Sequence, residues 1–306
     1  MEIEINPSCK DIWVIEECRN PSTDYYILPA LKIIGFEDRI RIFNNPPHER
    51  VNFDLTLIFV RYLTYDWVSY IKKHSHRIKK IIYFMDDDIL DFKAWKGLPL
   101  KYQKKLFLKA YIWKKWLLSV GADFFVSNEY LLNKYHYLKP SILPPYPIFN
   151  YPQPNSNGAS QHVSLFYHGT SSHRRELNWL YDVVKEVISF NKNIVFEIIG
   201  DDQVYKKFKK LQRVIVSHPM RWEAYKYFLL TKKRHIGLVP ILYSNFNLAR
   251  SYTKFFEVTA CGAVGIYSKD SIYREIVSHE EDGVLLPNDK KEWVNIIKKL
   301  VDNESY

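Results

Sequence analysis

Short apolar runs alternate along the chain with segments whose apolar residues recur at helical spacing. In the first half, the apolar runs are typical of buried strands, which we expect at DIWVIEE, RIRIF, DLTLIFVRY, KKIIYFM and ADFFVSN. Helical spacing appears between them, in TYDWVSYIKKH, in a long segment from Lys101 to Ser119 and in EYLLNKYHY. Strands that alternate with helices predict an α/β fold with a parallel, doubly wound sheet.

The same alternation restarts after a stretch rich in proline, asparagine and serine. We expect strands at VSLFYHG, NIVFEIIGD, VIVSHP, HIGLVPIL, AVGIYS and GVLLPN, with helices at HRRELNWLYDVVKEVISF, WEAYKYFLLTKK, FFEVTACGA and KEWVNIIKKLV. The composition of the intervening stretch is typical of a linker. The sequence therefore predicts an N-terminal domain over residues 1–150, a linker over 151–162 and a C-terminal domain over 163–306.

Composition and charge narrow the class of protein. Of the 306 residues, 47% are apolar and 25% charged, which is typical of globular rather than disordered chains. The formal net charge of +10 favours phosphates, nucleic acid or an anionic membrane surface as partners. No nucleic-acid-binding motif accompanies that charge, and the lysines are spread over both halves, so we expect no nucleic acid partner.

Cysteine usage and the length of the apolar runs indicate the compartment. Three widely spaced cysteines, Cys9, Cys18 and Cys261, form neither a disulfide framework nor a metal site, which fits a reducing cytosol. No apolar run approaches the length of a membrane span. We therefore expect a cytoplasmic protein, either soluble or peripheral at the inner face of the cell membrane.

A polar loop between the expected strand HIGLVPIL and the expected helix FFEVTACGA carries candidate ligand-binding residues. Loops at this end of a parallel sheet are where open α/β folds place ligands. Cations beside a helix start suit a diphosphate, and a carboxylate there can accept both hydroxyls of a ribose. The candidates are Asn247, Arg250, Ser251, Lys254 and Glu257. The alternative is an ordinary loop with a solvated charged face.

Residues 163–300 resemble the nucleotide-sugar-binding domain of GT-B glycosyltransferases, specifically the family-4-like ("group 1") set. SLFYHGTSSHRREL stands at their first strand and loop, and FEIIGD is similar to their strand ending in glycine. HIGLVPILYSNFNLARSYTKFFEVTACGAVGIYS resembles their signature region, and DGVLLPND their short strand before the last helix. In the first half, IFVR followed by IIYFMDDDILDF resembles a subset of these enzymes. The resemblance implies the GT-B fold, in which two Rossmann-like doubly wound domains face each other across a cleft.

The resemblance also implies site residues. Glu257 matches the second of two glutamates that the family often has eight positions apart, and the first falls on Ala249. The family's arginine falls on Thr170 and its lysine near Arg174 or Arg175, so Arg250 and Lys254 are candidate substitutes. Together with those cations and Glu257, the donor-binding candidates are His168, Gly169, Thr170, Arg174, Gly200, Asn247 and Ser251. His168 has a strand-end structural role as its alternative.

Three consecutive carboxylates, Asp86, Asp87 and Asp88, follow an expected buried strand. Their mutual repulsion suggests a use, such as binding sugar hydroxyls or accepting the proton of the acceptor. The alternative is that one of them caps the next segment while the others are solvated. We take all three, with Glu257, as catalytic candidates, and Arg61 and Asp88 as acceptor-binding candidates. A plain surface arginine is the alternative for Arg61.

The expected helix from Lys101 to Ser119 suggests a further partner. Five lysines fall on one face with apolar residues among them, which suits an anionic membrane surface: Lys101, Lys104, Lys105, Lys109 and Lys115. The alternative is a helix whose apolar face packs on the sheet.

The predicted function is that of a glycosyltransferase that moves a sugar from a nucleotide-activated donor to a saccharide or lipid-linked acceptor. The resemblance implies a retaining, metal-independent reaction without a cofactor beyond the nucleotide sugar, in bacterial surface polysaccharide or glycoconjugate synthesis such as that of capsule or lipopolysaccharide. Two alternatives stay open. One is a GT-B transferase of a CMP-activated acidic sugar such as Kdo, and the other is a non-catalytic GT-B subunit that binds a sugar or a partner.

Overall fold

The computed structural model describes residues 3, 5, 11–48, 51–149, 162–169 and 173–302, which form two compact units. The first unit comprises Met1–Ile148 and Ser244–Ser251, and the second comprises Phe149–Tyr243 and Tyr252–Tyr306. The loop between residues 243 and 252 thus belongs to the first unit, although the chain on either side of it belongs to the second. The predicted linker at 151–162 lies outside the described residues except for His162.

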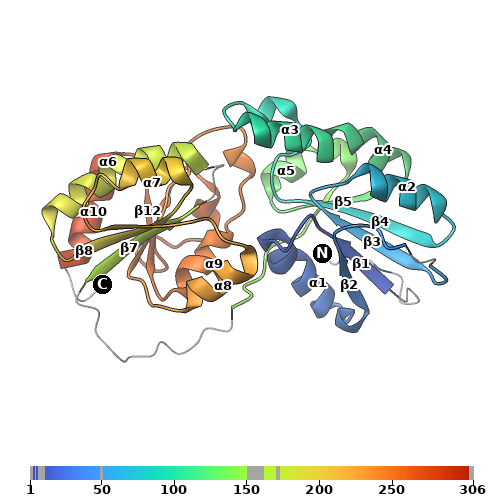
Figure 1. Ribbon diagram of the computed structural model, residues 1–306, viewed down its shortest axis with the longest axis horizontal. Coiled ribbons are helices and arrows are strands. Elements are labelled where there is room, and N and C mark those ends of the chain that lie inside the picture. Colours follow the sequence, from blue (N-terminus) through green and yellow to red (C-terminus); the bar gives the residue numbers. More distant parts are fainter. Residues whose placement is uncertain are drawn as a thin grey trace. The chain divides into compact units, whose positions relative to one another are not determined.

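The first unit is built on a parallel sheet in the order β2-β1-β3-β4-β5-β6 (Figure 1). Its strands are β1 (Asp11–Ile15), β2 (Ile40–Phe43), β3 (Leu55–Val60), β4 (Ile78–Met85), β5 (Asp123–Val126) and β6 (Ser141–Ile142). The central strand β3 is buried at every position, as its continuous apolar sequence predicts for a strand covered on both faces. Numbered along the chain, this order extends the flavodoxin-like arrangement 2-1-3-4-5 by one strand.

Helices cover both faces of this sheet. They are α1 (Leu28–Ile33), α2 (Tyr65–Lys73), α3 (Leu100–Lys109), α4 (Lys114–Ser119) and α5 (Glu129–Lys134). A π-helical turn, Thr23–Ile27, leads into α1 on one face, whereas α2, α3 and α4 lie on the other (Figure 1). Side-chain caps fix two helix starts, because the Thr64 hydroxyl accepts from the Trp67 amide and the Asn128 side chain accepts from the Leu131 amide.

The single helix expected from Lys101 to Ser119 is instead two helices joined by a 3-10 turn, Tyr111–Trp113. The break falls at Ala110, whose backbone has φ −134° and ψ −63° and whose side chain is fully buried. The Lys109 carbonyl accepts a hydrogen bond from the Leu63 amide at 2.7 Å, outside the helix. The sequence pattern missed the break because tertiary packing, rather than a proline or glycine, causes it.

The second unit carries a parallel sheet in the order β12-β11-β10-β7-β8-β9 (Figure 1). Its strands are β7 (Val163–His168), β8 (Ile194–Ile199), β9 (Val214–Ser217), β10 (Ile236–Val239), β11 (Val264–Ser268) and β12 (Val284–Leu286). Counted from β7 as the first strand, this is the Rossmann order 3-2-1-4-5-6, so the strand order reverses between β7 and β10. Ligands of such sheets bind outside the carboxyl ends of the strands at that reversal.

The helices of the second unit are α6 (Arg174–Phe190), α7 (Asp202–Phe208), α8 (Trp222–Leu230), α9 (Thr253–Ala260) and α10 (Lys290–Asp302). Helices α6 and α10 pack together on one face of the sheet, and α8 and α9 lie on the other (Figure 1). The apolar stripe of α6, from Leu177 to Ile188, is buried in this core with Trp293 of α10. The prediction of two doubly wound α/β sheets is therefore confirmed. In the part of the chain that the structure describes, no helix is both long and apolar enough to cross a membrane.

Candidate functional site

In the first unit, polar side chains gather where β3 and β4 end. Arg61 follows β3 in a left-handed conformation, with φ 68°, and its carbonyl accepts a hydrogen bond from the Tyr83 hydroxyl at 2.5 Å. A non-glycine residue held in that region is strained and is typical of functional sites. The Arg61 guanidinium contacts Asp87 Oδ2 at 2.7 Å and Asp86 Oδ1 at 3.4 Å. The Tyr102 hydroxyl accepts a further hydrogen bond from Arg61 at 2.9 Å.

The buried carboxylates Asp88 and Asp86 have different partners. Asp88 is fully buried and bonded to Lys134 and the Tyr135 hydroxyl, so both of its oxygens are engaged within the fold. Burial raises the pKa of Asp88, although those two hydrogen bonds oppose the rise. Burial likewise raises the pKa of Asp86, whose Oδ2 accepts from the Ser22 hydroxyl at 2.7 Å.

The loop Ser244–Ser251 lies against these carboxylates within the first unit. Arg250 reaches Asp87 Oδ1 at 3.2 Å and its guanidinium stacks on the Phe246 ring at 4.9 Å. The Asn128 amide donates to the Ala249 carbonyl at 2.9 Å, and the side chain of Ala249 is fully buried. The sequence grouped Asn247, Arg250 and Ser251 with Lys254, but the structure places these three in the first unit and Lys254 in the second.

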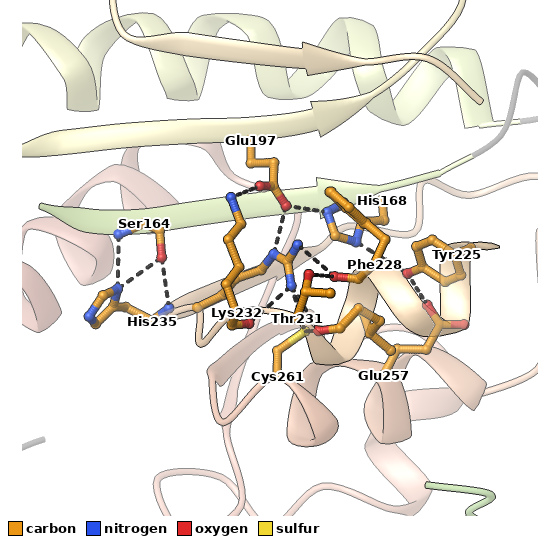
Figure 2. Close-up of polar contacts among 12 residues, drawn as sticks. Ser164, His168, Glu197, Tyr225, Phe228, Thr231, Lys232, His235, Glu257 and Cys261 are labelled. Atoms are coloured by element: carbon orange, nitrogen blue, oxygen red, sulfur yellow. Dashed lines mark hydrogen bonds and ion pairs between the residues drawn. The ribbon is translucent and has the colours of Figure 1, made fainter. Parts of the chain in front are cut away.

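In the second unit, a buried polar network connects the carboxyl end of β7 to α8 and α9 (Figure 2). His168, the last residue of β7, is 5% exposed, and its Nε2 lies 2.9 Å from Glu197 Oε1. Its Nδ1 lies 3.2 Å from the Tyr225 hydroxyl, which in turn lies 2.9 Å from Glu257 Oε2. The network therefore links Glu257 of α9 to Glu197 of β8 through two intervening side chains.

Glu197 is the charged anchor of this network. It lies in the middle of β8, 2% exposed, and pairs with Arg234 Nε at 2.6 Å and with Lys232 Nζ. Burial alone would raise the pKa of Glu197, but hydrogen bonds from His168 and Lys232 and the charge of Arg234 outweigh burial and lower it to about 2. Burial also lowers the pKa of His168 to about 4. At neutral pH Glu197 is therefore a carboxylate and His168 an uncharged imidazole.

Glu257 and Lys254 lie on the first two turns of α9, next to the end of β7. Glu257 is 8% exposed, and burial raises its pKa against the opposing charge of Lys254. The Lys254 ammonium lies 3.8 Å from Glu257 Oε2 and donates to the His168 carbonyl. These two residues, with His168 and Gly169, stand at the strand reversal where a Rossmann sheet binds its ligand.

The remaining donor-binding candidates do not take part in the network around His168 and Glu257. Arg174 pairs with Asp201, the residue that caps α7, at 2.9 Å. A Cβ at Gly200 would lie 2.4 Å from Val204, so close packing against α7 accounts for this glycine. Thr170 lies outside the described residues.

Sequence reasoning missed Glu197, Arg234 and Tyr225. A signal for Glu197 exists in NIVFEIIG, because a single carboxylate in a buried apolar strand must find a partner. No comparable signal marks Arg234, which is 1% exposed, or Tyr225. Across residues 11–48, 51–149, 162–169 and 173–302, no three His, Cys, Asp or Glu side chains are arranged to hold a metal ion.

Comparison with known proteins identifies the fold. No protein-family model matches this sequence, and no curated protein does. Among solved structures, Anabaena HepE in complex with UDP and glucose is 11% identical with a TM-score of 0.61, over 97% of this chain and 91% of that one. The pneumococcal O-GlcNAc transferase GtfA in complex with UDP and GlcNAc is 13% identical with a TM-score of 0.56, over 82% of this chain and 51% of GtfA.

S. aureus TarM is also 13% identical, with a TM-score of 0.55, over 82% of this chain and 48% of TarM. The chain thus spans about half the length of GtfA and TarM. At these identities the likeness concerns architecture. The chain has the GT-B fold, as the resemblance in its sequence implied.

Proposed function

We propose that this protein is a glycosyltransferase that moves a sugar from a nucleotide-activated donor to a saccharide or lipid-linked acceptor. One observation carries the proposal: Glu257 and Lys254 lie together at the strand reversal of the second unit. The GT-B fold is shared with solved structures that contain UDP, which supports a nucleotide sugar as the donor.

The donor is proposed to bind at the second unit. An ionised Glu257 accepts hydrogen bonds from the two ribose hydroxyls, and Lys254, in the first turn of α9, lies beside the diphosphate. Departure of the nucleotide builds negative charge on that diphosphate. A fixed ammonium and the amino end of a helix stabilise such charge without reorganisation, which is the basis for proposing a metal-independent reaction.

The acceptor is proposed to bind at the first unit, with Asp86 and Asp87 contacting its hydroxyls. Among the described residues, Asp86 Oδ1 has no hydrogen-bond partner, although it is buried 3.4 Å from Arg61 Nε. An incoming hydroxyl that donates to this oxygen would satisfy it. Retention is proposed because the leaving diphosphate can then take the proton of the acceptor, so that neither Asp86 nor Asp87 must act as a base.

A membrane-bound or lipid-linked acceptor fits the surface of α3 and α4. Leu100 is 82% exposed, and further apolar side chains of α3, of α4 and of the turn between them are exposed: Phe107, Leu108, Ile112 and Leu118. The neighbouring lysines Lys101, Lys104 and Lys115 are exposed as well. Apolar residues among cations suit an anionic membrane surface. Binding to vesicles with anionic lipid, weakened in Lys101→Glu/Lys104→Glu and absent with neutral vesicles, supports this part of the proposal, whereas equal binding to both vesicle types contradicts it.

A thermal-shift screen of the purified protein against UDP, GDP, ADP, dTDP and CMP tests the donor site. A ligand at a hundred times its dissociation constant stabilises the protein by about 2.7 kcal/mol. We expect one nucleotide diphosphate to raise the melting temperature and Glu257→Gln to abolish that shift. Glu275→Gln is a matched control, because Glu275 is exposed. Selective stabilisation by CMP would instead favour a transferase of a CMP-activated sugar. No change in melting temperature with any nucleotide would favour a non-catalytic subunit.

A further inference from the structure

The buried network of the second unit restricts where its hydrogens can lie. Four side chains from four elements form a row of polar contacts in the order Glu197, His168, Tyr225 and Glu257 (Figure 2). The successive distances between their polar atoms are 2.9, 3.2 and 2.9 Å. Glu197 also pairs with the cations Arg234 and Lys232, so it is an acceptor only. His168 Nε2 must therefore carry the hydrogen that lies between it and Glu197.

The Tyr225 hydroxyl can donate one hydrogen, and His168 and Glu257 compete for it. If His168 is neutral, its Nδ1 can only accept, so the Tyr225 hydrogen points to His168 and Glu257 must be a protonated carboxyl that donates to Tyr225. If Glu257 is a carboxylate, the Tyr225 hydrogen points to Glu257, and the contact with His168 is a hydrogen bond only when Nδ1 carries a second hydrogen. Each state satisfies all three contacts, and the two states hold the same number of protons.

We propose that His168 and Tyr225 are positioning residues for Glu257, and that binding of a ribose at Glu257 moves the proton of that carboxyl through the Tyr225 hydroxyl to His168. The proposal rests on the proposed function, because it takes Glu257 as the ribose-binding group. In the step, the Glu257 O–H bond breaks as its proton passes to Tyr225 Oη, and the Tyr225 O–H bond breaks as its proton passes to His168 Nδ1. A neutral pair becomes a carboxylate and an imidazolium, and no electrons are transferred.

The environment favours the neutral pair before a ribose binds. Burial raises the pKa of Glu257 and lowers the pKa of His168, and the charges of Arg234 and Lys254 also lower the pKa of His168. Lys232 contacts the same network through Glu197, and Glu197 itself favours the imidazolium. Cys261, near Arg234 at the end of α9, stays neutral because burial raises its pKa to about 11.

A ribose reverses this preference. Two adjacent hydroxyls both donate, and only an ionised carboxylate offers an acceptor to each without a hydrogen of its own in the way. Lys254, at 3.8 Å, adds a favourable charge for the carboxylate. The resulting imidazolium places a positive charge at the end of β7, directly before Gly169, where the diphosphate is proposed to lie.

Histidine ¹⁵N NMR tests the proposal, with the His168 resonances assigned from a His168→Gln variant and UDP as the probe. In the wild type at pH 7, UDP is expected to move His168 Nδ1 from the range of an unprotonated ring nitrogen to that of a protonated one. Tyr225→Phe is expected to bind UDP more weakly and to show no such change at saturation. Tyr227→Phe, on the same helix and 76% exposed, is the control and should behave as the wild type.

A titration without nucleotide separates this proposal from the proposed function. Ionisation of Glu257 on raising the pH should alter the His168 Nδ1 shift in the wild type, and this inflection should vanish in Glu257→Gln and in Tyr225→Phe. An inflection that persists in Glu257→Gln, or is absent from the wild type, overturns the proton connection whether or not UDP binds. UDP binding that leaves His168 Nδ1 unprotonated overturns the ribose step. Failure to bind any nucleotide, with the inflection present, overturns the donor assignment alone.

Discussion

Glu197 offers the sharpest test of how the second unit is held together. Glu197→Gln keeps the size of the side chain and removes its charge, leaving Arg234 buried without a counter-charge. Arg234 is 1% exposed and lies 2.6 Å from Glu197. Removing one partner of a buried ion pair costs about 3–5 kcal/mol, because the remaining charge stays desolvated.

The lowered pKa of Glu197 leads to a similar magnitude. Its pKa falls from 4.5 to about 2 on folding, and each pH unit of such a shift corresponds to about 1.4 kcal/mol. The carboxylate thus contributes about 3 kcal/mol, present above pH 4.5 and lost as the pH falls towards 2. This contribution lies within the range expected for the loss of one partner of a buried ion pair.

Urea denaturation at pH 7, followed by tryptophan fluorescence, measures the effect. Glu186→Gln is the matched control, since Glu186 pairs with Lys298 at 3.2 Å on the surface, with a side chain 59% exposed, where ion pairs contribute about 0–1 kcal/mol. We expect Glu197→Gln to lower the free energy of unfolding by about 3 kcal/mol and the control by under about 1 kcal/mol. Equal losses of stability in the two variants would refute the argument that the buried Glu197–Arg234 pair contributes more than a surface ion pair.

Substitutions at other buried positions test the remaining contacts. Because burial lowers the pKa of His168 from 6.5 to about 4, the unfolded chain takes up a proton first, so urea titrations between pH 6.5 and 4 should show the wild type losing about 3 kcal/mol more stability than His168→Gln. Asp88→Asn should lower the melting temperature markedly, since both of its oxygens are bonded to Lys134 and Tyr135. Asp86→Asn should change stability less, because Arg61 keeps its ion pair with Asp87, yet it should lower sugar transfer, measured as nucleotide release. Gly200→Ala should lower the free energy of unfolding by about 1–3 kcal/mol through its clash with Val204, as calorimetry would detect. An undiminished stability in Asp88→Asn or Gly200→Ala, or a pH profile of His168→Gln identical to that of the wild type, would contradict the respective argument.

The strands and the parallel sheets could be predicted from the sequence because they follow from the local pattern of apolar and polar residues. Apolar runs such as KKIIYFM are long enough to form buried strands, and β4 indeed spans Ile78–Met85. Alternation with helices then determines a parallel sheet, since parallel strands need crossover connections. The candidate residues at strand ends were also visible, because polar clusters such as Asp86-Asp87-Asp88 stand out directly after an apolar run.

The partners of those residues were not open to prediction, because they are set by tertiary contacts. Asp88 is bonded to Lys134 and Tyr135, which lie at the end of α5, beyond α3, α4 and β5 in the chain. Arg250 belongs to the first unit, where it pairs with Asp87, although the segments before and after its loop in the sequence belong to the second unit. No periodicity in the sequence indicates which unit a loop joins. The contacts of Glu197 with Arg234 and His168 could not be predicted for the same reason.

The most direct test of the donor site compares UDP with 2′-deoxy-UDP by isothermal titration calorimetry. If Glu257 accepts both ribose hydroxyls, loss of one hydrogen bond to a charged group should weaken binding by about 1.5–3 kcal/mol, or roughly 10- to 150-fold. In Glu257→Gln the two nucleotides should bind with nearly equal, weaker affinity, while Glu275→Gln keeps the wild-type difference. Equal affinities of the wild type for both nucleotides, or a preference for UDP that survives in Glu257→Gln, would contradict the assignment of Glu257 and with it the central claim.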